Sequence, residues 1–245
     1  MFDDIKEREL GLGDIIKDGW AVYSQQITAI ILITLLVYLP MNIAGYFYAE
    51  YITRNPDLSI ANIVELFLGI FVLVIIAFIA QMAIVLIVEH AIKNDKSELN
   101  WMTALRQAFF RLGSLVGSSF LGGLIIVGLT LFLVIPGIIW SIYYTFVLQV
   151  VVLRDVGGKK ALDYSKSLVK GRWWRVFWKL LAVGIIYAVI ASILGAAENF
   201  LPECGGIITD TCASLAYAFY NVASTVLFLN LEYINLTQER KHALG

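Results

Sequence analysis

The chain has 245 residues, of which 60% are hydrophobic and 15% are charged, and its formal net charge is −1. Soluble domains have about a quarter of their residues charged, so this composition, with a mean hydropathy of +0.80, excludes an ordinary soluble domain. It predicts an integral membrane protein, and the length predicts a single membrane domain over residues 1–245.

Six apolar runs are candidates for membrane-spanning helices. The predicted spans lie near Ile27–Ala49, Phe67–Val88, Ser114–Ile135, Ile138–Leu153, Val176–Ala197 and Cys212–Leu236. Because the number of spans is even, both termini are expected on the same side. The segment before the first span carries several acidic residues, which predicts a retained signal anchor rather than a cleaved signal peptide.

Only Pro136 and Gly137 separate the third and fourth spans. A single helix from Ser114 to Leu153 would be about 60 Å long, roughly twice the thickness of the hydrocarbon core. Proline cannot continue the helical hydrogen-bond ladder and glycine accepts a positive φ, so we expect a tight reversal at these two residues. The alternative is one helix with a proline kink.

All lysines and arginines except Arg54 fall on one side of this arrangement. Loops rich in lysine and arginine stay in the cytoplasm. The charge distribution therefore predicts a multi-pass protein with its N- and C-termini in the cytoplasm.

Each pair of spans is preceded by a short amphipathic segment, at Asp14–Ile27, Trp101–Leu112 and Lys159–Arg175. Apolar residues recur in these segments at helical spacing, which is typical of helices lying in the membrane interface. The sequence thus predicts an all-α polytopic membrane protein with six transmembrane helices in three hairpins, each preceded by a cytoplasmic-side interfacial helix. The predicted units form a repeat over residues 14–92, 101–156 and 159–236.

Small residues recur four positions apart on two of the spans. The stripes are Gly184, Ala188, Ser192 and Ala196 on the fifth span and Ser118 with Gly122 on the third. Small residues allow helices to approach closely in a membrane. Each stripe is expected to meet either another span of the same chain or a second copy in a homo-oligomer.

Three charged residues occupy equivalent ends of the three hairpins: Glu89, Arg154 and Glu232. Charged side chains at membrane depth are usually paired or functional. We expect them to meet as a polar cluster if the hairpins surround a common axis. The alternative is that each side chain extends separately to the lipid headgroups. Gln81 and Gln149 lie deeper and are expected to tie helices together.

Cys204 and Cys212 both fall in the loop predicted between the fifth and sixth spans, on the outer side. An even pair of cysteines in an oxidising compartment is typical of a disulfide. We expect this bond to form, with two unpaired thiols as the alternative.

Residues for catalysis or metal binding are scarce. The chain has 2 histidines, which excludes a histidine-rich metal site, and no glycine-rich phosphate loop is followed by lysine and a hydroxyl residue. We therefore expect no catalytic residues, cofactor or metal, because an enzyme would have to rely on isolated carboxylates.

The stretch from Leu133 to Leu180 carries a resemblance. It combines the Pro136-Gly137 turn, the run Val150-Val-Val-Leu-Arg154-Asp155, an amphipathic segment starting at Ala161-Leu162 and the basic aromatic run Arg172-Trp-Trp-Arg175. This stretch resembles the YciC-like bacterial integral membrane proteins, which are related to the membrane domain of some glycerophosphodiester phosphodiesterases. The resemblance implies a protein of the bacterial cytoplasmic (inner) membrane. It does not imply hydrolysis, because the hydrolase domain of the fused members is missing here.

Two functions are compatible with these features. The first is a non-catalytic accessory, scaffold or assembly component that contacts anionic membrane lipids and a partner protein, with no nucleic-acid partner. The residues expected at the lipid interface are Lys159, Lys160, Lys166, Lys170, Arg172, Trp173, Trp174 and Arg175. The alternative is a small transporter or channel through Gln81, Gln149 and the charged cluster. Scarce interior polar residues, and the expectation that no helix is broken in its central third, weigh against transport.

Overall fold

The structure of the chain is a computed structural model that describes residues 4–54, 59–93, 99–198, 200–201 and 205–244. Over these ranges it is helical, with no strand. The elements are α1 (Asp4–Glu7), α2 (Leu12–Gln25), α3 (Ile27–Ile33), η1 (Thr34–Tyr38), α4 (Leu39–Arg54), α5 (Ile60–Lys93), α6 (Trp101–Phe132), α7 (Val134–Tyr143), α8 (Val147–Arg154), α9 (Lys159–Val169), α10 (Trp173–Glu198) and α11 (Gly205–Leu244).

Six helical stretches in the described ranges are long and apolar enough to cross a membrane. They are Ile27–Arg54, Asn62–Lys93, Trp101–Leu131, Val134–Arg154, Trp173–Glu198 and Gly205–Gln238. The prediction of an all-α, multi-pass protein with six such helices is confirmed at this level.

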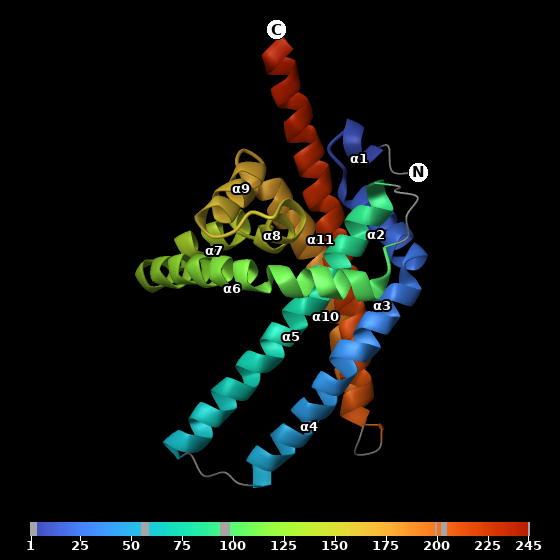
Figure 1. Cartoon of the computed structure of the whole chain (residues 1–245), viewed down its shortest axis with the longest axis vertical. Coiled ribbons are helices and arrows are strands. Elements are labelled where there is room, and N and C mark those ends of the chain that lie inside the picture. Colours follow the sequence, from blue (N-terminus) through green and yellow to red (C-terminus); the bar gives the residue numbers. More distant parts are fainter. Residues whose placement is uncertain (1–3, 55–58, 94–98, 199, 202–204, 245) are drawn as a thin grey trace.

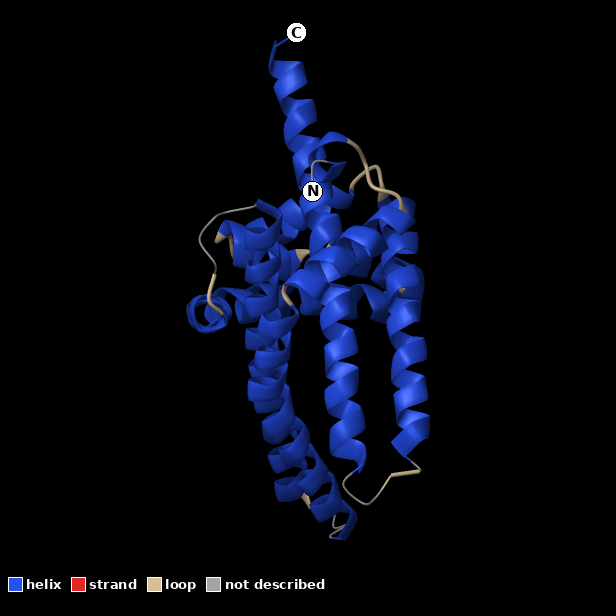
Figure 2. Cartoon of the chain, turned by 90° about the vertical axis from the view of Figure 1, so that its right-hand side faces the viewer, coloured by secondary structure: helices blue, strands red, loops and turns tan. Residues whose placement is uncertain are grey.

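Helix α11 forms the centre of the molecule. It packs against α10, α2, α5 and α1, and every residue from Asn221 to Glu232 is buried. Both termini lie at one end of the molecule, whereas Arg54 ends α4 near the opposite end (Figures 1 and 2). We call the end that holds the termini and α9 the basic end, and the opposite end the outer end.

Helix α6 is oriented differently from the other long helices. Figure 1 shows it lying across the direction of α11, whereas α5, α10 and the α3–α4 segment run toward the outer end. The third span was predicted to stand upright as part of a hairpin. Instead, the predicted interfacial segment Trp101–Leu112 continues without interruption into the apolar segment that follows it, and the whole helix lies crosswise.

The reversal between α6 and α7 occurs before the predicted turn. Leu133 breaks the helix with an extended backbone (φ −156°, ψ 129°), and Pro136 lies in the first turn of α7, where its missing N–H is tolerated. Gly137 has no positive φ. Its role is close packing, because a Cβ there would lie 2.0 Å from Oγ1 of Thr130.

The predicted fourth span is broken near its middle. Helix α7 ends at Tyr143 and α8 begins at Val147. Ser165 of α9 bridges the break, since its hydroxyl donates to the Tyr143 carbonyl (2.8 Å) and accepts from the Phe146 N–H (3.2 Å). The expectation of unbroken central thirds is therefore wrong for this span.

A second irregularity lies in the first span. Residues Thr34–Tyr38 form a π-helical turn just before Pro40, and such turns accommodate a proline or mark a functional position. The Thr34 hydroxyl is buried without a hydrogen-bond partner among the described residues. The helix continues through this turn from Ile27 to Arg54, so this span is irregular but not broken.

The third predicted amphipathic segment, Lys159–Arg175, forms two elements rather than one helix. Helix α9 covers Lys159–Val169, and Gly171 adopts a positive φ of 80°, which favours glycine. Helix α10 then begins at Trp173, so Trp173 and Arg175 belong to a long apolar helix.

Candidate functional site

The structure brings Glu89, Arg154 and Glu232 together at the basic end. Arg154 is the last residue of α8, Glu89 lies near the end of α5 and Glu232 lies on the central α11. The Arg154 guanidinium donates from Nε to Glu232 Oε1 (2.6 Å), from Nη2 to Glu232 Oε2, and from Nη1 to Glu89 Oε1 (2.6 Å). One arginine thus joins three helices, with a bidentate pair to α11.

Two further residues complete the charged cluster. The Lys93 ammonium lies 2.9 Å from Glu89 Oε1, and the Tyr164 hydroxyl of α9 donates to Glu232 Oε1 at 2.5 Å. Burial, followed by the Glu232 carboxylate, raises the pKa of Tyr164, so the hydroxyl remains a proton donor. Two carboxylates and two cations balance, which is how a protein interior tolerates charge.

The cluster becomes less accessible toward the centre of the molecule. The exposed fractions of the side chains are 24% for Arg154, 13% for Glu89 and 4% for Glu232. Both oxygens of Glu232 accept hydrogen bonds. This geometry suits a carboxylate that holds helices together more than one that transfers protons. In the described ranges, no group of three histidine, cysteine or acidic residues could hold a metal.

Asn230 of α11 is bonded to the N-terminal segment. Its side chain is fully buried; Oδ1 accepts from the Leu10 N–H (3.1 Å), and Nδ2 donates to the Ile5 (2.9 Å) and Arg8 (2.8 Å) carbonyls. These three bonds attach the N-terminal segment to α11. An asparagine in an apolar run is typical of a polar contact, but nothing local in the sequence indicates a partner more than 200 positions away.

The predicted lipid-contact residues divide into two groups. Arg172 and Arg175 lie 3.9 and 2.5 Å from Oε2 of Glu9, and Lys179 lies 3.1 Å from Oε1. Glu9 therefore holds the start of α10 to the N-terminal segment, a role that the sequence did not reveal.

The other group lies on α9 and beside it. Lys159, Lys160 and Lys170 are exposed, and the Lys166 ammonium lies 4.2 Å from the ring centroid of Trp140. Trp174 is exposed, whereas the Trp173 Nε1–H donates to the Ile139 carbonyl at 3.0 Å. Lysines of α9 and Trp174 therefore remain at the surface.

The two deeper glutamines both contact α11. Gln149 Nε2 donates to Ser224 Oγ at 3.2 Å, and its buried Oε1 has no hydrogen-bond partner among the described residues. The backbone carbonyl of Gln81 accepts from Asn221 Nδ2 at 3.1 Å. These contacts tie helices together, and they do not join the charged cluster.

The predicted disulfide is not supported. Cys212 is an exposed free cysteine, and Cys204 lies outside the described residues. The prediction assumed one loop containing both residues, but α11 already begins at Gly205. Cys212 therefore lies two turns inside a helix rather than in a loop.

Comparison with protein-family models, with curated proteins and with solved structures found no match to this chain. The family resemblance of Leu133–Leu180 remains a prediction from the sequence.

Proposed function

We propose that the protein is a non-catalytic accessory or scaffold component of the bacterial cytoplasmic membrane that organises lipid and a partner protein around a helix lying in the plane of the inner leaflet. The observation that carries this proposal is the crosswise position of α6 (Figure 1). A helix that lies across the spanning helices does not run through the bilayer alongside them.

The two faces of α6 support this placement. Ala104, Ala108 and Leu115 are buried against the rest of the protein, whereas Phe120 and Leu131 are 68% and 82% exposed. A long helix with one packed face and one exposed apolar face suits the boundary between headgroups and acyl chains. Exposed apolar area on this scale also marks a site for lipid or protein contact.

Charge supports the orientation of the whole chain. The basic end carries the exposed lysines of α9, and the outer end carries Arg54. By the positive-inside rule, the basic end and both termini face the cytoplasm. The exposed lysines then lie where anionic headgroups attract each cation by about 1 kcal/mol.

Depth measurements on α6 test the proposal. Spin labels are placed at Phe109, Phe120 and Leu131, one at a time, in a variant without cysteines. Because these residues share the exposed face, an in-plane helix gives all three labels similar depths by oxygen and nickel accessibility. An upright helix would change the depth by about 16 Å over each interval of 11 residues, and that result would refute the proposal.

Transport is the second candidate function, and the two helix irregularities favour it. Solute sites in transporters often lie at interrupted helices, and here the break at Tyr144–Phe146 and the π turn at Thr34–Tyr38 both neighbour buried polar atoms without partners among the described residues. Planar-bilayer recordings distinguish the two candidate functions in the case where the transported solute is an ion. The accessory function predicts no conductance from purified protein, and reproducible conductance would favour a channel.

A further inference from the structure

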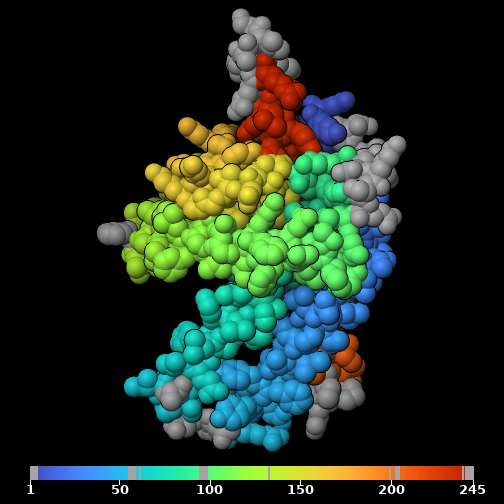
Figure 3. All heavy atoms as spheres, in the orientation of Figure 1, coloured from blue at the N-terminus to red at the C-terminus, as the bar shows by residue number. Residues whose placement is uncertain are grey.

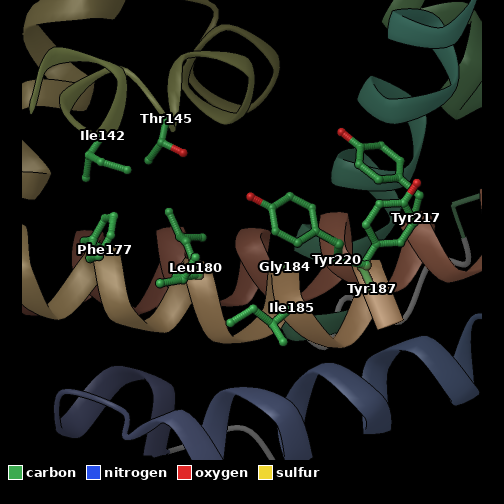
Figure 4. Close-up of a pocket in the computed structure, with 11 residues that line it drawn as sticks. Ile142, Thr145, Phe177, Leu180, Gly184, Ile185, Tyr187, Tyr217 and Tyr220 are labelled. Carbon is green, nitrogen blue, oxygen red and sulfur yellow. The ribbon is translucent and has the colours of Figure 1, made fainter. Parts of the chain in front are cut away.

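An apolar groove runs along α10 below the break between α7 and α8. It has a volume of about 560 Å³ and is open along one side. Figure 4 shows Phe177 at one end and Tyr187 at the other, with Ile142 and Thr145 over the first of these ends. The Phe177 end of the groove lies toward the start of α10 and therefore toward the basic end.

The length of the groove matches one leaflet. Its lining on α10 extends from Phe177 to Ala188, which is about 16 Å along a helix. Half of the hydrocarbon core of a bilayer is about 15 Å thick. Trp174 and Trp178 are exposed around the start of α10, where tryptophans mark the headgroup level. The groove therefore begins just below the headgroups and ends near the bilayer centre.

Polar groups are placed as an ester lipid requires. No described residue hydrogen-bonds to the hydroxyls of Thr145 or Tyr220, which face the space between them in Figure 4. Thr145 lies at the basic end of the groove, at the depth expected for glycerol ester carbonyls. On α9, the Lys166 ammonium lies 5.9 Å from the ring centroid of Tyr143, which follows the lining residue Ile142 in α7, and Lys170, at the end of α9, is exposed.

We propose that this groove binds one anionic phospholipid of the inner leaflet, with an acyl chain along α10 and the phosphate at Lys166 and Lys170. The apolar lining, the leaflet-length extent and the cations at one end together select this ligand over a soluble solute. The assignment to the inner leaflet rests on the orientation in the proposed function.

Substitutions of small residues on α10 test the site. Leucine at Gly184 fills the groove, since a Cβ there has only Tyr220 nearby at 3.9 Å and the fold need not move. The matched control is Gly195→Leu on the same helix, where a Cβ has nothing within 4 Å. Ala188→Trp, at an exposed lining position, is a second variant that fills the groove. It tests the site even if Gly184→Leu does not fold.

Native mass spectrometry of each variant, released from bilayer discs of mixed phosphatidylglycerol and phosphatidylcholine, counts the retained lipids. The wild-type protein and Gly195→Leu should retain one phosphatidylglycerol, and both filling variants should lose it at least tenfold. Equal retention in all four proteins would overturn the proposal. A second outcome would also overturn it: the wild-type protein is a dimer, and both filling variants are monomers with unchanged lipid retention. A second copy of the chain would then occupy the groove.

A separate variant tests the placement of the phosphate at the two lysines. The Lys166→Gln/Lys170→Gln variant should lose its preference for phosphatidylglycerol over phosphatidylcholine while retaining one lipid, and an unchanged preference would overturn the placement of the phosphate. An in-plane α6 without a retained lipid would refute this site alone, whereas an upright α6 would refute the proposed function.

Discussion

The basic end and the outer end of the molecule are built in different ways. At the basic end, α11 is surrounded by helices, all residues from Asn221 to Glu232 are buried, and polar groups join distant segments. At the outer end, α5 exposes Ile60, Phe67 and Phe71, and Figure 3 shows its outer half projecting from the body of the molecule. The difference shows where protein contacts, rather than lipid, determine the structure.

The physical reason lies in the solvent. In the orientation proposed above, lipid tails surround the outer half, and association of apolar side chains there gains little, because lipid is as apolar as they are. In the same orientation, water and headgroups are close to the basic end, so burial of apolar surface and paired charges both contribute there. Substitutions at the basic end should therefore change stability far more than substitutions at the outer end.

The largest effect is expected from removal of the central cation. Arg154→Met leaves Glu89 and Glu232 without their shared partner, and breaking a buried pair in this way costs about 3–5 kcal/mol. The free energy of unfolding, measured by titration with a denaturing detergent, should fall by this amount. As an outer-end control, Leu68→Ala should change it by less than about 0.5 kcal/mol.

A neutral cluster sharpens this result. Arg154→Met combined with Glu89→Gln and Glu232→Gln removes the unpaired charges, so stability should recover relative to Arg154→Met alone. No loss in the single variant would mean that the three side chains are separately solvated by headgroups.

Asn230→Ala should give the next largest effect. The change leaves the Leu10 N–H and two backbone carbonyls without their partner, and unsatisfied buried groups cost about 1–3 kcal/mol each where water cannot reach them. We expect a loss of about 3 kcal/mol and faster hydrogen exchange at Leu10. Asn235→Ala, which removes a contact to the Arg172 side chain, is the control and should cost less; equal losses would argue against a specific clamp.

A smaller loss is expected where α6 meets α9. A Cβ at Gly122 would lie 3.1 Å from the Leu162 side chain, whereas at Gly123 nothing lies within 4 Å. Gly122→Leu should therefore destabilise by about 1–3 kcal/mol through overpacking. Gly123→Leu is matched in chemistry and should be close to neutral, so similar unfolding curves for the two variants would contradict the packing of this crosswise helix.

The smallest effect concerns pH at the start of α2. The Gly11 N–H donates to the Asp14 carboxylate at 3.0 Å, and this bond, together with Arg8, lowers the pKa of Asp14 below 3.8. A lowered pKa stabilises the fold above 3.8, and the stabilisation is lost as pH falls through the folded-state value. Asp14→Asn should lower the melting temperature slightly at pH 6, and the difference from wild type should shrink below pH 3.8. A difference that is constant with pH would exclude this linkage.

Several parts of this structure were predictable from local chemistry. Apolar runs that are long enough to span the hydrocarbon core predict helices, because a helix pairs all of its backbone groups internally and unpaired backbone groups are costly in lipid. The meeting of Glu89, Arg154 and Glu232 was one of two alternatives that the sequence left open, because charges at membrane depth either find partners or extend to the headgroups. The contact of Asn230 with the N-terminal segment was not anticipated, since an amide can pair with any backbone group that the fold brings near.

The sequence by itself determined that the chain is helical, apolar enough for six crossings and segregated in its basic charge, because these properties depend on composition and residue spacing. Only the tertiary structure decided that α6 lies crosswise and that Ser165 bridges a break in the following span. An apolar helix gives the same sequence pattern whether it stands in lipid or lies along it. Its orientation depends on contacts such as Gly137 against Thr130 and Gly122 against Leu162, which form only after distant segments have packed.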